Sequence, residues 1–141
     1  MKKIKLVIVD DDNLCLLIAS KLLNTHLPER STYEIESFID PIVGFETVKT
    51  YLERKKDCFE NEILVILLDI SMPIMNGWQF LEALDSIDSQ NQIKVFMHSS
   101  SLDESDQKKA LDFNRVQHYF HKPLTSQKID LLHSLILELI N

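Results

Sequence analysis

Glycine is scarce in this chain, which has only Gly44 and Gly77 among 141 residues. A Gly-rich loop that wraps a phosphate group needs several glycines close together. The sequence therefore argues against a nucleotide-binding P-loop and against a dinucleotide-binding fold. Internal repeats, low-complexity tracts and Gly/Ser linkers are absent as well.

Cysteine is equally rare, and Cys15 and Cys58 show neither CxxC spacing nor a disulfide framework. We expect Cys15 to pack and Cys58 to be a loop thiol, with a reducing cytoplasm as the location. No stretch approaches the roughly 18 apolar residues of a membrane span. The N-terminal apolar run is interrupted and soon meets three aspartates, so it is too short for a signal peptide.

Basic residues are outnumbered, because 15 Lys and Arg stand against 22 Asp and Glu and give a net charge of -7. This balance favours solubility and argues against a direct nucleic-acid surface. The length fits one domain over residues 1–141, with 45% hydrophobic residues to build its core. We expect no separate output domain.

Four apolar runs end in polar residues. They are Ile4–Val9 before Asp10, Asp11 and Asp12; Leu64–Leu68 before Asp69; Ile93–His98 before Ser99; and Val116–His121 before Lys122 and Pro123. Such runs suit strands covered on both faces of a parallel sheet. Ligand groups gather at the carboxyl ends of these strands. Carboxylates crowded there repel one another unless a cation joins them, so they indicate a divalent metal site.

Strand and helix patterns alternate five times, which predicts an α/β fold: a doubly wound five-stranded parallel sheet with helices on both faces. The alternating segment Tyr33–Phe38 suits an edge strand. Five helices are expected. The first has Asn13 as its N-cap and ends near Leu27–Pro28, the second begins at Pro41 and continues past Leu52, and the last runs from about Ser126 to Ile140. The third begins at Asn76–Gly77, and the fourth is capped by Asp103. We interpret the charged segment 53–62 as a frayed helix end and solvated loop; a lineage-specific contact is the alternative.

The polar motifs at the strand ends occur in a fixed order. They are Val9-Asp10-Asp11, Asp69-x-x-Met72-Pro73-x-x-Asn76-Gly77, Ser99-Ser100 and Lys122-Pro123. Each motif alone is weak, but together they resemble the receiver domain of two-component response regulators over nearly the whole chain. The resemblance, to a chemotaxis-type stand-alone receiver, implies a flavodoxin-like strand order 2-1-3-4-5.

The resemblance also implies a phosphoryl-transfer site that uses Mg²⁺. Asp69 would be the nucleophile that accepts the phosphoryl group. Asp11 and Asp69 would bind Mg²⁺ directly, Asp10 would bind largely through water, and the Ser71 backbone carbonyl would complete the protein ligands. Magnesium prefers such oxygen ligands and usually retains waters.

Further roles follow from the same resemblance. Lys122 would pair with Asp69 or its phosphoryl oxygens, and Ser99 would donate its hydroxyl to one of them. Pro123 follows Lys122 as in the family's Lys-Pro bond, which is often cis, and Gly77 is a second structural position.

The resemblance further implies a switch pair. Ser99 would move toward the phosphoryl group and vacate space into which Tyr119 could rotate. The readout surface would be the fourth helix, the fifth strand and the fifth helix. One departure weakens this prediction, because Asn114-Arg115 replaces the Gly-Ala turn that is common before strand five.

Several polar residues near the motifs are assigned outside the site. Asp12 fits a helix start or surface acid better than a metal ligand. We expect His98, His118 and His121 to be packed or surface histidines rather than ligands.

Two other functions compete with the phosphorylated receiver. Phosphatases of the haloacid-dehalogenase type also form aspartyl phosphates, but they need a second Asp two residues after the nucleophile, where this chain has Ser71. A pseudo-receiver that binds partners without phosphorylation is the stronger alternative. We do not expect an enzyme beyond the protein's own phosphoryl transfer and dephosphorylation.

The expected partners are proteins. A histidine kinase or histidine phosphotransfer protein would supply the phosphoryl group, and a downstream protein of unknown identity would read it; we expect no nucleic acid and no membrane. The last helix is rich in Leu and Ile, which either forms a homodimer face or packs as a single buried helix.

Overall fold

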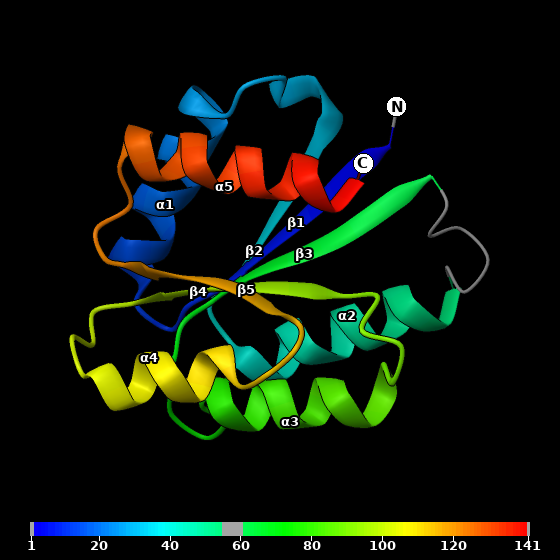
Figure 1. Ribbon diagram of the computed structural model, residues 1–141, viewed down its shortest axis with the longest axis vertical. Helices are drawn as coiled ribbons and strands as arrows, with labels where there is room; N and C mark the ends of the chain where they lie inside the picture. Colours follow the sequence, from blue (N-terminus) through cyan, green and yellow to red (C-terminus); the bar gives the residue numbers. More distant parts are fainter. Residues whose placement is uncertain (1, 55–60, 141) are drawn as a thin grey trace.

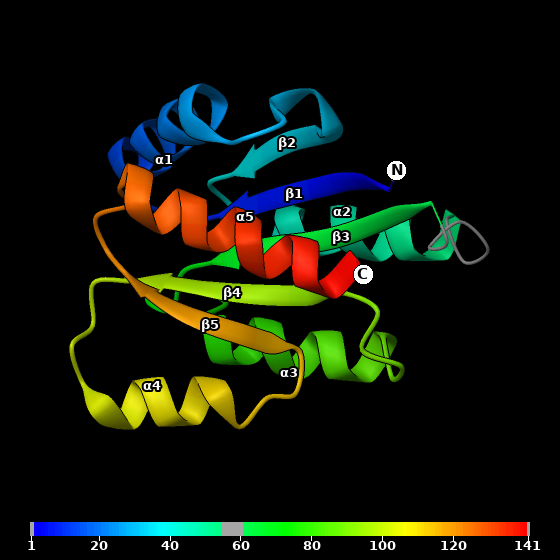
Figure 2. The same ribbon diagram turned by 45° about the horizontal axis from the view of Figure 1, so that its top comes forward.

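A five-stranded parallel sheet forms the centre of the protein in the computed structural model, which describes residues 2–54 and 61–140. The strands are β1 (Lys3–Val9), β2 (Tyr33–Phe38), β3 (Glu62–Leu68), β4 (Lys94–Ser99) and β5 (Val116–His121). The helices are α1 (Asn13–His26), α2 (Pro41–Arg54), α3 (Gly77–Ile87), α4 (Glu104–Leu111) and α5 (Ser126–Ile140), with a short 3-10 helix η1 (Arg30–Thr32) before β2. The strand order β2-β1-β3-β4-β5 confirms the predicted fold class (Figure 2).

Helices cover both faces of the sheet, with α1 and α5 on one face and α2, α3 and α4 on the other (Figure 1). Strand β1 shows why the apolar runs are uninterrupted. Its Leu6 and Ile8 pack in the core beneath α1 and α5, whereas Val7 and Val9 pack in the core beneath α2 and α3. Alternate side chains of a strand point to opposite faces, so a strand buried on both sides needs apolar residues throughout.

The edge strand β2 is tied to the last helix. Tyr33 and His133, both buried, share a hydrogen bond of 2.7 Å between the tyrosine hydroxyl and Nδ1 of the histidine. Glu34 on the same strand is exposed, which fits the predicted edge position.

The N-cap of the first helix lies one residue earlier than predicted. Asp12, not Asn13, is the N-cap of α1, and its carboxylate accepts hydrogen bonds from the backbone N–H groups of Leu14 and Cys15. Both residue types are good N-caps, and here the carboxylate of Asp12 satisfies the free donors of the first turn. The prediction for Asn13 was therefore wrong, whereas the helix-start role expected for Asp12 is confirmed.

The other predicted boundaries are close to the observed ones. Asn76 caps α3 through a capping box with Gln79, and Asp103 caps α4. Strand β4 begins at Lys94, one residue later than predicted. Within the charged segment 53–62, Glu53 and Arg54 end α2, and residues 55–60, with Cys58, lie outside the described residues.

Candidate functional site

Three carboxylates meet at the carboxyl ends of β1 and β3. Asp10, Asp11 and Asp69 each offer one oxygen, and these oxygens lie within 4.8 Å of one another. The backbone fixes this arrangement, because the N–H of Asp69 donates to the carbonyl of Val9 at 3.0 Å and the N–H of Asp10 donates to that of Phe38 at 3.1 Å. An all-oxygen donor set of this kind fits a hard divalent cation such as Mg²⁺.

The environment of Asp69 opposes its negative charge. Its side chain is buried, and this burial together with the nearby charge of Asp10 raises the pKa of Asp69 to about 6. Lys122 and a hydrogen bond of 2.9 Å from the N–H of Ile70 act in the opposite direction. A cation beside the cluster would therefore favour the ionised, nucleophilic form of Asp69.

Lys122 supplies a positive charge from the end of β5. Its Nζ lies 2.8 Å from Oδ2 of Asp10 and 3.6 Å from Oδ2 of Asp69. Burial alone would lower the pKa of Lys122, but the hydrogen bond to Asp10 and the charges of both carboxylates outweigh it and raise that pKa. The lysine contacts Asp10 more closely than Asp69, its expected partner. The peptide bond between Lys122 and Pro123 is cis.

Ser99 lies at the end of β4, and the loop that follows joins it to Tyr119. Ser99 Oγ accepts a hydrogen bond of 3.1 Å from the N–H of Ser101, and the Tyr119 hydroxyl donates to the Ser101 carbonyl at 3.2 Å. Both Ser99 and Tyr119 are buried. Ser99 and Tyr119, the predicted switch pair, therefore both form hydrogen bonds with the same loop residue, Ser101.

Gly77 and Ser71 lie in the segment that leads from β3 into α3. A Cβ atom at Gly77 would meet the carbonyl oxygen of Asp69 at 2.6 Å and Cα of Ile70 at 2.8 Å, so only glycine fits this close approach. The N–H of Gly77 also donates to the Ile70 carbonyl at 2.8 Å. Ser71 is exposed in the loop directly after this contact, and its carbonyl as a metal ligand stays a prediction.

Comparison with known proteins decides the family. The sequence model of the response regulator receiver domain matches residues 6–133. The chain belongs to this family. No curated protein matches the chain.

Solved structures of receivers share the fold. A two-component response regulator from Cytophaga hutchinsonii is 24% identical with a TM-score of 0.79, and the match covers 98% of this chain and 99% of that one. A response regulator receiver protein from Dyadobacter fermentans is 26% identical with a TM-score of 0.76, and the match covers 96% of each chain. The chain is also similar to a structure of the CheX-CheY-BeF3-Mg²⁺ complex from Borrelia burgdorferi, at 21% identity and a TM-score of 0.68, covering 97% of this chain and 90% of that one.

Receivers of this family are signalling domains of two-component systems that bind Mg²⁺ in an acidic pocket, and Asp10, Asp11 and Asp69 form such a pocket here. Among the described residues, none of the helices combines the length and apolar character that crossing a bilayer requires.

Sequence reasoning missed the role of one residue. Arg115, noted only as a departure from the family pattern, is completely buried and pairs with Asp85 and Asp88. A lone arginine in a predicted turn carries no sign of burial, and its partners lie about 30 residues away. His98 is packed, as expected, and its burial beside Lys122 lowers the pKa of its ring to about 4.

Proposed function

We propose that this receiver accepts a phosphoryl group on Asp69 in a Mg²⁺-dependent reaction and signals by changing its binding to other proteins. One observation carries the proposal: two carboxylates after β1, one after β3 and the ammonium of Lys122 after β5 converge on one point. This set has the charges that phosphoryl transfer to a carboxylate needs.

Each residue of the site would have its own role in the phosphoryl transfer. A carboxylate oxygen of Asp69 attacks phosphorus of a phosphohistidine, the phosphorus–nitrogen bond breaks, and the electron pair leaves with the imidazole, which takes up a proton. Mg²⁺ held by Asp10, Asp11, Asp69 and the Ser71 carbonyl would neutralise negative charge on the phosphoryl oxygens. Lys122 would shift from Asp10 to a phosphoryl oxygen, a small movement because its Nζ already lies 3.6 Å from Asp69. Ser99 would donate its hydroxyl to another.

The donor and the reader would both be proteins. We propose a histidine kinase or histidine phosphotransfer protein as donor, because the family works in two-component systems. The similar protein from Borrelia burgdorferi was solved in a complex of CheX, CheY, BeF3 and Mg²⁺, which supports protein binding as the output of such a domain. We further propose that this domain works in the cytoplasm, where a histidine kinase or phosphotransfer protein would reach it.

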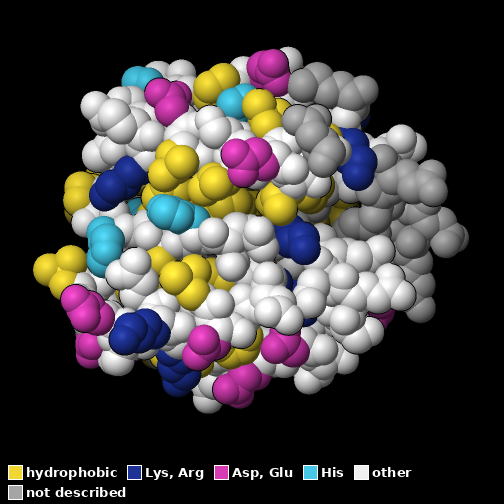
Figure 3. All heavy atoms as spheres, viewed as in Figure 1, with side chains coloured by type: hydrophobic (Ala, Val, Ile, Leu, Met, Phe, Trp, Pro, Cys, Tyr) yellow, Lys and Arg dark blue, Asp and Glu magenta, His cyan; other side chains and the backbone are white. Residues whose placement is uncertain are grey.

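Helix α5 leaves part of its apolar surface exposed, which is the one observation that favours a homodimer. The helix buries Ile129, Leu132 and Ile136 against the sheet, which accounts for much of its apolar surplus. Leu131 stays 42% exposed, and hydrophobic side chains gather over α5 in the upper half of Figure 3. Self-association therefore stays a secondary proposal.

Intact mass after incubation with acetyl phosphate tests the proposal. We expect wild type to gain one phosphoryl group only with Mg²⁺, and Asp69→Asn to gain none. Asp12→Asn is the matched control, since it makes the same change beside the cluster and retains an oxygen that can cap α1. If neither acetyl phosphate nor a range of histidine kinases labels wild type, the pseudo-receiver is the better description.

A further inference from the structure

Helix α4 has little apolar contact with the rest of the protein. Of its eight residues only Ala110 is buried. Four of its eight residues are charged, and side chains of both signs are visible in the lower left of Figure 3. Because apolar burial contributes so little, polar contacts at its two ends decide where α4 lies.

Ser101 links the amino end of α4 to the phosphorylation site. Its N–H donates to Ser99 Oγ at 3.1 Å, and its carbonyl accepts from the Tyr119 hydroxyl at 3.2 Å. Its own hydroxyl donates to Asp106 Oδ2 at 2.7 Å and accepts from the N–H of Asp103 at 3.3 Å. One residue thus contacts the site hydroxyl, the core tyrosine and the first turn of α4.

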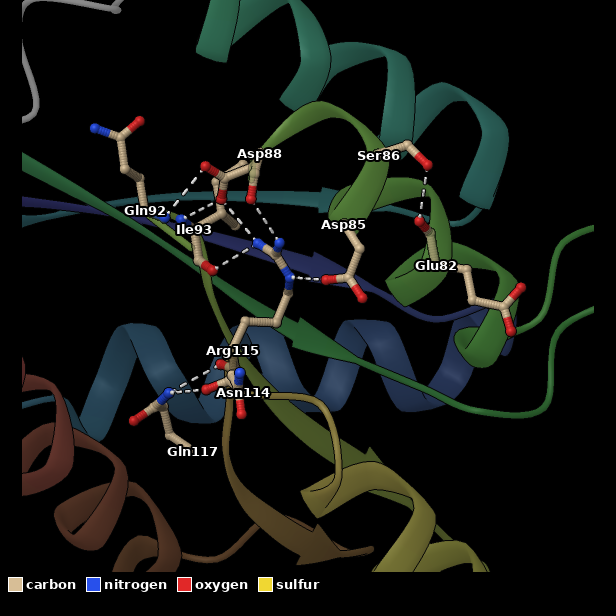
Figure 4. Close-up of polar contacts among 9 residues, drawn as sticks. All are labelled: Glu82, Asp85, Ser86, Asp88, Gln92, Ile93, Asn114, Arg115 and Gln117. Atoms are coloured by element: carbon tan, nitrogen blue, oxygen red, sulfur yellow. Dashed lines mark hydrogen bonds and ion pairs between the residues drawn. The ribbon is translucent and has the colours of Figure 1, made fainter. Parts of the chain in front are cut away.

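Arg115 fixes the segment at the carboxyl end of α4, just before β5 (Figure 4). Its guanidinium donates to Asp88 Oδ2 at 2.8 Å, to the Asp88 carbonyl at 2.9 Å, to the Ile93 carbonyl at 3.1 Å and to Asp85 Oδ1 at 3.0 Å. The Arg115 carbonyl in turn accepts from the N–H of Val95 at 2.9 Å. The turn between α4 and β5 is therefore bonded both to the end of α3 and to the start of β4.

The carboxyl half of α4 has a second attachment to α3. The ammonium of Lys109 lies 4.7 Å from the ring centroid of Trp78, which is a cation–π contact. This contact and the Arg115 pairs both join α4 or its following turn to α3.

The polar contacts at the amino end of α4 break more readily than those at its carboxyl end. The Ser101–Asp106 hydrogen bond is part-buried, so water can replace either partner. Arg115 and Asp88 have side chains with 0% and 2% exposure, and separating them would leave an uncompensated buried charge. A change that starts at Ser99 would therefore open the amino end of α4 first.

We propose that Ser101 is a positioning residue that couples Ser99 to the first turn of α4 through Asp106, while Arg115 holds the α4–β5 turn in place. The proposal rests on the proposed function. When Ser99 turns toward a phosphoryl oxygen, the Ser101 N–H loses its acceptor, the Ser101–Asp106 bond opens, and α4 pivots about its carboxyl end. The phosphorylation-dependent surface is then the 100–106 segment rather than the whole of α4 and β5.

Residue-resolved amide hydrogen exchange tests the coupling without any phosphoryl group. Asp106→Ala removes the acceptor, and Asp106→Asn keeps a side-chain oxygen. Glu104→Ala is the matched control, because Glu104 is the other acid in the first turn of α4. We expect the amides of Ser101 and Asp103 to exchange about fivefold faster in Asp106→Ala, as for the loss of one hydrogen bond, and Asp106→Asn to restore protection. Equal exchange in Asp106→Ala and Glu104→Ala would overturn the role of Asp106.

The second arm adds Mg²⁺ and beryllofluoride, an analogue of the phosphoryl group. We expect exchange at Ser101 and Asp103 in wild type to rise to the level of Asp106→Ala, while the amides of Val95 and Val116 stay unchanged. Equal changes at all four amides would overturn the fixed turn. Resonance shifts at Asp69 report binding of the analogue independently, so absent shifts count against the proposed function, whereas the first arm still decides the role of Asp106.

Discussion

Lys122 donates a hydrogen bond to Asp10, with 2.8 Å between Nζ and Oδ2, and this pair joins the end of the last strand to the end of the first. Both side chains are largely buried, at 13% and 4% exposure. The lysine therefore compensates charge inside the carboxylate cluster before any phosphoryl group arrives, and its removal should affect stability as well as phosphorylation.

Lys122→Met should destabilise the protein at pH 7 by about 1–3 kcal/mol, because buried carboxylates lose their cation. The loss should shrink at pH 5, because Asp69, whose pKa is raised to about 6, can take up a proton there instead. Urea unfolding followed by circular dichroism measures this difference. Lys108→Met on the exposed side of α4 is the control, and an equal effect of both substitutions would count against a compensating role for Lys122.

Asp69→Asn should stabilise the metal-free protein at pH 7. The pKa of Asp69 is raised from 3.8 to about 6 in the folded state, so its contribution to stability is fully present below pH 3.8 and is lost as pH rises through 6. The gain on substitution should therefore be about 2 kcal/mol at pH 7 and near zero at pH 4. Unfolding in urea across this range measures it. Asp130→Asn, at an exposed acid of α5, gives the baseline, and a gain at pH 4 as large as at pH 7 would contradict the prediction.

Mg²⁺ should stabilise the folded protein by mass action. At a free concentration ten times the Kd, the expected gain is about 1.4 kcal/mol. Thermal unfolding with and without Mg²⁺ measures it. Asp11→Asn should reduce the gain and Asp12→Asn should retain it, since only Asp11 belongs to the carboxylate cluster. The same gain in both variants would exclude Asp11 as a ligand.

Arg115→Met should cost about 3–5 kcal/mol of unfolding free energy, because Asp88 would keep a buried charge without its partner. Asp85→Ala should cost about 0.5 kcal/mol, since the Asp85 side chain is 52% exposed and its pair with Arg115 is screened by solvent. Urea unfolding of the two variants side by side distinguishes them. Similar losses would show that the buried Asp88 pair is not the main anchor.

Much of the fold could be predicted because its signals are local. The apolar runs give the strands, and Pro28, Pro41, Asn76 and Asp103 mark helix ends through backbone constraints that act within a few residues. The choice between Asp12 and Asn13 as N-cap was missed, because both residue types cap helices well and only the backbone geometry distinguishes them.

Some features of the site could likewise be predicted from the sequence, and others could not. The polar residues of the site lie at or just after the carboxyl ends of strands, so the topology of a parallel sheet predicts that they meet; they are Asp10, Asp11, Asp69, Ser99 and Lys122. The burial of Arg115 depends on Asp85 and Asp88, which become neighbours only after α3, β4 and β5 have packed. No local pattern contains that information. The partner that Lys122 prefers is likewise decided by distances that only the folded structure shows.

The charged residues of the site are synthesised in the order of the strands that they follow. Asp10 and Asp11 come with β1 and Asp69 with β3, whereas Lys122 follows β5. During synthesis the three acids are therefore translated long before the lysine, and a nascent chain holds the repelling charges without their internal counter-ion. The receiver can reach its compensated, fully packed state only after β5 has joined the edge of the sheet.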